Sequence, residues 1–159
     1  MYSTILLAYD GSIEGRLALR EGAQLAQTFG ARVVLLAVVE PVFDPYLAGE
    51  VGAYSQRETA GDLKKILDEG RERLSRMGLS AEVRLEMGPA AERITFVAQE
   101  ILADLVVVGH HKQGMMARWL RGSVTTSLSD SLNCSLLVAR LEITDDDLFK
   151  AAETNSSNQ

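Results

Sequence analysis

The sequence of 159 residues contains a single cysteine, Cys134, so an internal disulfide framework is excluded. It contains no apolar run that approaches the roughly 20 residues needed to span a bilayer. It opens with an apolar segment that has neither the basic flank nor the cleavage site of a secretory signal. These absences predict a soluble protein of the cytoplasm that is stabilised by its hydrophobic core alone.

Basic residues are also in short supply, since 16 Lys and Arg face 22 Asp and Glu and the net charge is −6. A duplex-binding protein needs a basic surface to neutralise phosphates, so nucleic acid is excluded as the expected partner. Residues 142–159 contain five acidic residues and one lysine and lose apolar periodicity. We therefore predict one domain over residues 1–141, followed by an acidic, polar and disordered tail over residues 142–159.

The remaining chain alternates short β-branched runs with longer segments of helical periodicity, which is typical of βαβ units. This pattern predicts an α/β fold, a single doubly wound domain with a five-stranded parallel sheet flanked by four helices. Two strands are expected at the sheet edges: the least apolar one, residues 81–86, and the last one, residues 135–141. Pro89 should open a helix that faces inward through Leu102, and residues 41–55 should form a long loop.

Ligands of doubly wound sheets bind beyond the carboxyl ends of the strands, and the segment after the fourth strand is the most informative there. Gly109 ends that strand, and Gly122 with Ser123 begins a helix. Free amides, the positive helix end and the Ser123 hydroxyl could together bind a phosphate, and the intervening loop adds cations such as Lys112. The alternative is that Gly109 only turns the chain and Ser123 only caps the helix.

Asp10 lies at the same edge, after the first strand, where it could bond a ribose or a base. The alternative is a local turn in which Asp10 holds the backbone while Ser12 caps the next helix. A phosphoryl-transfer nucleophile would need a second carboxylate two residues earlier, and Ala8 occupies that position. Catalysis is therefore not expected from this turn.

Several standard sites are excluded by what surrounds these residues. Met115 and Met116 stand where a Walker A loop needs Lys and Ser or Thr, and no G-x-G-x-x-G follows the first strand. The two histidines, His110 and His111, have no partners at metal-ligand spacing, so no metal site is expected. The sequence contains no Ser-His-Asp or Cys-His arrangement that indicates nucleophilic catalysis.

Three segments carry a resemblance to a known family: Ile5–Ser12, Val33–Val39, and Ala103–Gly109 followed by Gly122-Ser123-Val124. The last has the outer spacing of the signature G-x₂-G-x₉-G-[S/T]. On these residues the sequence resembles the universal stress protein family. The resemblance implies an adenine nucleotide alpha hydrolase-like fold, a homodimer, and ATP bound with or without Mg²⁺. It also implies a regulatory or stress-response role, involving an unidentified protein partner, with no turnover beyond weak ATP hydrolysis.

The resemblance also implies which residues bind the nucleotide, with Asp10 and the backbone of Val38 towards the adenine and ribose. The phosphates would face Gly109, Gly122, Ser123 and Val124. The middle glycine of the signature is replaced by Lys112, and the nearest glycine is Gly114. An alternative function is therefore a protein-interaction dimer with the same fold and an empty nucleotide site. The candidate binding residues are Ala8, Tyr9, Asp10, Val38, Val108, Gly109, Lys112, Gly114, Gly122, Ser123, Val124 and Thr125.

Overall fold

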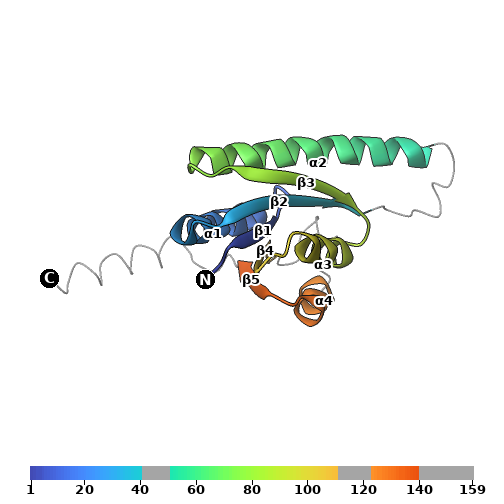
Figure 1. Ribbon diagram of the computed structural model, residues 1–159. Helices are drawn as coiled ribbons and strands as arrows, with labels where there is room; N and C mark the ends of the chain where they lie inside the picture. The colour runs from blue at the N-terminus through green and yellow to red at the C-terminus, as the bar shows by residue number, and fades with distance from the viewer. Residues whose placement is uncertain (41–50, 111–122, 140–159) are drawn as a thin grey trace, which may run out of the picture.

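The computed structural model describes residues 1–40, 51–110 and 123–139, and within them strands and helices alternate along the chain (Figure 1). No helix in these three ranges is long and apolar enough to cross a membrane. The elements are β1 (Thr4–Ala8), α1 (Ile13–Phe29), β2 (Arg32–Val39), α2 (Val51–Arg76), β3 (Ala81–Met87), α3 (Ala90–Glu100), β4 (Leu105–Gly109), α4 (Ser123–Ser131) and β5 (Ser135–Ala139).

The strands form one parallel sheet in the order β3-β2-β1-β4-β5. The predicted fold class is confirmed, and so is the placement of β3 and β5 at the two edges. The central strands are buried on both faces, as their continuous apolar sequences require, whereas β3 alternates between half-buried and exposed residues.

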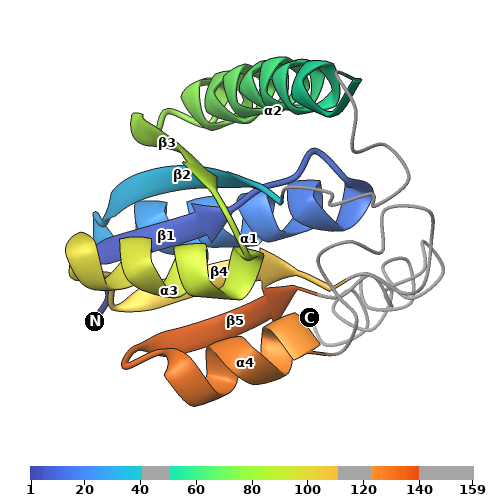
Figure 2. The same cartoon turned by 90° about the vertical axis from the view of Figure 1, so that its right-hand side faces the viewer.

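Helices cover both faces of the sheet, with α1 and α2 on one side and α3 and α4 on the other (Figure 2). Successive strand residues point to opposite faces, so Ile5 and Leu7 pack against α1 and α2, and Leu6 packs on the α3 side. Each such side chain is almost wholly buried, which contributes about 1.5–3 kcal/mol relative to an exposed position. Two cores, one on each face, therefore hold the sheet in place.

The ends of α1 follow the capping signals of its sequence. Ser12 is the N-cap, and its hydroxyl accepts a hydrogen bond from the Gly15 amide at 2.9 Å. Gly30 ends the helix with a left-handed φ of 65°, and its amide donates to the Ala26 carbonyl. The strand that precedes Ser12 is thereby joined to α1 by a short, defined turn.

Two local predictions were wrong. The loop expected over residues 41–55 is shorter, because α2 already begins at Val51. No proline lies between residue 45 and the end of α2, and the first part of this helix contains good helix formers despite Gly52. Leu102 does not face inward but is 83% exposed, because α3 ends at Glu100 and Leu102 adopts a left-handed φ of 52°. Helical periodicity no longer applies to a residue beyond the helix end.

Candidate functional site

The site expected at the carboxyl edge of the sheet lies where the chain changes direction. β1 and β4 are neighbours at the centre, and the chain proceeds from β1 outward to β2 but from β4 outward to β5. In doubly wound sheets this change of direction is the place where ligands bind, beyond the carboxyl ends of the two strands. Asp10 follows β1 and Gly109 ends β4, so the structure brings these two predicted residues to the same place.

The turn after β1 is held by its own side chains. The Asp10 Oδ1 atom accepts hydrogen bonds from the Ser12 amide at 3.0 Å and from the Ser12 hydroxyl at 2.6 Å. Gly11 between them has a φ of 77°, which L side chains rarely adopt. The local turn considered for Asp10 is thus confirmed, together with the capping role of Ser12. It also fixes the Asp10 carboxylate at this edge of the sheet, where a ligand contact stays a prediction.

Gly109 is held directly against the first turn of α1. A Cβ atom at this position would lie 2.6 Å from the carbonyl carbon of Glu14, 2.7 Å from its oxygen and 2.8 Å from the Gly15 nitrogen. All three are backbone atoms that no side-chain rotation can move. The glycine at the end of β4 therefore has a packing role, in addition to the ligand and chain-turn roles predicted from the sequence.

Gly15 is a site residue that sequence reasoning missed. A Cβ on Gly15 would overlap Asp10 Oδ1 and lie 3.1 Å from the Ser12 hydroxyl oxygen. Only glycine therefore lets the Asp10 carboxylate and the Ser12 hydroxyl close over the start of α1. A glycine in the first turn of a helix costs roughly 0.5–1 kcal/mol relative to alanine, and that cost was the signal available in the sequence.

Glu40 is a second residue that was missed. It follows β2, and its Oε1 atom accepts a hydrogen bond from the Ala90 amide at 2.8 Å. Pro89 at the N-cap of α3 offers no side-chain hydrogen bond, so Glu40 supplies the cap from another part of the chain. Its negative charge also suits the positive end of α3. The N-terminus of α3 is therefore satisfied by the protein itself.

Four predicted site residues lie at the ends of strands, with their side chains turned into the protein. Ala8, Val38 and Val108 point into the core on the α3 side, and Val38 is fully buried. Tyr9 points to the other face, where its hydroxyl lies 3.1 Å from Glu69 Oε2 of α2. Burial raises the pKa of Tyr9 above its usual value. Any contact of these residues with a ligand would come from main-chain atoms.

The predicted phosphate-binding segment is only partly described. Lys112, Gly114 and Gly122 lie outside the described residues, and Ser123 and Val124 begin α4 as expected. Thr125 follows in the first turn, and its hydroxyl is buried without a hydrogen-bond partner in the described part of the chain. Within the same residues no group of three His, Cys, Asp or Glu side chains could hold a metal ion.

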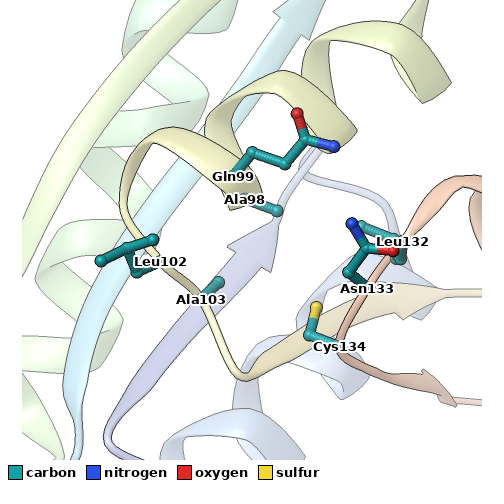
Figure 3. Close-up of a pocket in the computed structure, with 7 residues that line it drawn as sticks. All are labelled: Ala98, Gln99, Leu102, Ala103, Leu132, Asn133 and Cys134. Atoms are coloured by element: carbon teal, nitrogen blue, oxygen red, sulfur yellow. The ribbon is translucent and has the colours of Figure 1, made fainter.

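A pocket of about 310 Å³ lies at the opposite end of the molecule, between the end of α3 and the segment that joins α4 to β5 (Figure 3). Cys134 lines it, and burial together with the charge of Asp104 raises the pKa of the thiol. The thiol is therefore neutral at physiological pH. The pocket is lined by Ala98, Gln99, Leu102, Ala103, Leu132, Asn133 and Cys134, none of which belongs to the predicted nucleotide site.

Comparisons with known proteins agree with this geometry. Residues 1–140 match the model of the universal stress protein family. A universal stress protein of Thermus aquaticus is 32% identical over 88% of this chain and 100% of its own length. A solved family member from Burkholderia pseudomallei is 31% identical, with a TM-score of 0.67 over 86% of this chain and 95% of that one. A universal stress protein solved in complex with cAMP is 26% identical, with a TM-score of 0.66 over 87% and 97%.

Solved structures of more distant relatives, from Archaeoglobus fulgidus and Arabidopsis thaliana, contain dAMP and AMP at 20% and 14% identity, and these likenesses show the fold alone. The family model, by contrast, spans all five strands and all four helices of the described structure. It covers both segments, after β1 and after β4, that meet at the switch point. With its fold, its strand order and nearly its whole length in agreement, the chain belongs to the universal stress protein family.

Proposed function

We propose that this protein binds an adenine nucleotide at the carboxyl edge between β1 and β4 and uses it in a regulatory, stress-related role. The observation that carries the proposal is the preformed turn at the end of β1. Asp10, Ser12 and Gly15 form a rigid hydrogen-bonded unit directly beside Gly109, at the switch point of the sheet. A relative 26% identical to this chain was solved with cAMP, which supports an adenine nucleotide as the ligand class.

In this proposal the Asp10 carboxylate and the backbone near Val38 face the adenosine, while Gly109 and the start of α4 face the phosphates. Thr125 supports the phosphate end, because a buried hydroxyl without a partner in the described chain costs free energy until it finds one. α4 begins at Ser123, and the first-turn amides of a helix lack intrahelical partners and lie at its positive end, where phosphate binds favourably. ATP, with or without Mg²⁺, is the proposed physiological ligand.

The hydrogen bonds made by the carboxylates at this edge favour a protein that binds the nucleotide without efficient hydrolysis. Asp10 is engaged with Ser12, and Glu40 is engaged with the Ala90 amide. A general base must instead be able to take a proton from an attacking water. We therefore propose a nucleotide-responsive regulator, and a homodimer paired through β5 is the assembly proposed with it.

The test begins with protein purified from cells, denatured to release small molecules and analysed by chromatography for adenine nucleotides. Titration of emptied protein with ATP, ADP, AMP and cAMP would follow. Ser123→Ala should weaken binding roughly 10- to 100-fold, as expected for the loss of one charge-assisted hydrogen bond. Ser131→Ala, at the other end of α4, is the matched control and should leave the affinity unchanged.

Absence of nucleotide both in the purified protein and in the titrations would contradict the proposal. It would favour the same fold acting as a protein-interaction dimer with an empty site. An equal loss in both serine variants would instead place the effect on the stability of α4 and remove Ser123 from the site.

A further inference from the structure

A groove on the outer side of α1 and α2 concentrates positive charge. It encloses about 420 Å³, and four arginines line it together with a few apolar side chains. Arg16 and Arg20 come from α1, and Arg73 and Arg76 come from the end of α2. Ile13, at the mouth beside the first turn of α1, is 67% exposed. Such a cluster is unexpected in a chain whose net charge is −6.

The carboxylates of α2 neutralise these arginines only in part. Glu69 contacts both Arg16, at 3.0 Å, and Arg73, at 2.7 Å. Glu72 contacts Arg76 at 2.5 Å. Arg20 is exposed and has no ion-pair partner among the described residues. The groove therefore keeps a surplus of positive charge that is open to solvent, since the side chains of Arg16 and Arg73 are each 44% exposed.

The last described strand, β5, ends near the first turn of α1, whose Ile13 and Arg16 line the groove. Ala139, the last residue of β5, pairs with Gly109, and Gly109 lies against the backbone of Glu14 and Gly15. Neighbouring strands are about 4.8 Å apart, so Ala139 lies roughly 10 Å from the first turn of α1. Residues 145–147 follow Ala139 by six to eight positions, and an extended chain of that length spans about 20–26 Å, which covers this distance and the roughly 10 Å width of a helix. Residues 145–147 can therefore reach the arginines.

The composition of the tail matches the charge of the groove. Residues 145–147 are three consecutive aspartates, and residues 142–159 contain five acidic residues with a single lysine. We propose that the acidic segment Asp145–Asp147 binds the arginine groove of its own chain and straps the tail across the start of α1. The tether holds the tail at millimolar effective concentration, so individually weak, exposed ion pairs suffice. The contact is reversible and sensitive to salt.

Zero-length cross-linking of the full-length chain tests this contact. Arg20→Lys places a primary amine in the groove and preserves the charge. A water-soluble carbodiimide then joins this amine to a neighbouring carboxylate as an amide, and the reagent takes up the water and leaves as a urea. Lys64 and Lys65 are built-in controls: they immediately precede Ile66, which lies against Gly11 just before α1, and neither lysine lines the groove. Mass spectrometry of the digested monomer locates the amides.

The expected result is an intramolecular amide between position 20 and residues 145–147, several-fold more abundant than amides from the tail to Lys64 or Lys65. Its yield should fall several-fold at about 1 M salt, where the Debye length is about 3 Å. It should also be absent when the three aspartates are replaced by asparagine. Equal yields at all three amines, a yield independent of salt, or a cross-linked dimer in place of the monomer would each overturn the proposal.

Discussion

Replacing Gly109 by alanine tests whether this glycine is required by packing or only by a ligand. The new Cβ would lie 2.6–2.8 Å from three backbone atoms of Glu14 and Gly15, where ordinary contacts are 3.4–4 Å. Relief requires β4 and α1 to separate by several tenths of an ångström, and overpacking of this kind costs about 1–3 kcal/mol. With a urea m-value of about 1–3 kcal/mol per molar, the unfolding midpoint should fall by on the order of 1 M.

The matched control is Gly61→Ala, in the same protein and with the same added methyl group. Gly61 lies within α2 and has no atom within 4 Å of an added Cβ, so the substitution should raise the free energy of unfolding by about 0.5–1 kcal/mol. Urea unfolding of nucleotide-free protein measures both variants. A Gly109→Ala protein as stable as the parent would refute the packing argument and assign the glycine to the ligand alone.

Three further predictions concern nucleotide affinity, dimer assembly and the free energy of unfolding at acidic pH. Lys112→Gly restores the family signature but removes a cation, so nucleotide affinity should fall or stay level at low salt and depend less on salt; tight binding gained by the variant would mean that the natural site is closed. Leu137→Lys at the β5 edge should raise the monomer fraction in sedimentation without loss of cooperative unfolding, and a parent that is already monomeric at micromolar concentration would contradict the β5 dimer. Burial alone would raise the pKa of Glu69, but hydrogen bonds from Arg73 and Tyr9, with the charge of Arg16, lower it below 4.5. A carboxyl whose pKa is lower in the folded state stabilises the fold at pH values above its unfolded-state pKa, and this stabilisation is lost as the pH falls through its folded-state pKa. The difference in free energy of unfolding between the parent and Glu69→Gln should therefore shrink from about pH 6 to pH 3. A difference that stays constant over this range would refute the assignment.

Local features of the chain were sufficient to predict most of the secondary structure. Apolar periodicity located five strands and four helices, and Ser12 marked the start of α1 as the structure has it. These signals depend on side chains a few residues apart, which can be read along the sequence. The same signals failed at Leu102, where the left-handed backbone just beyond the end of α3 turned an apolar side chain to solvent.

The candidate site was predicted in part, because residues that end strands are visible in the sequence while their neighbours are not. Asp10 and Gly109 were both identified as edge residues. Their common position depends on the pairing of β1 with β4, which are about 100 residues apart in the chain, as the contact of the Thr4 amide with Asp104 illustrates. Glu40 was missed for the same reason, since its partner amide is 50 residues away.

The amino-acid sequence by itself thus determined the fold class, the Ser12 cap of α1 and the residue types at the strand ends. Tertiary structure alone decided which strand ends meet, that Gly109 must be a glycine because the backbone of α1 occupies its Cβ position, and that buried Tyr9 reaches the half-buried Glu69 of α2. The arginine groove likewise exists only because α1 and α2 lie side by side. The physical reason is that local propensity acts between near neighbours, whereas close packing between segments distant in sequence sets the position of every side chain at the site.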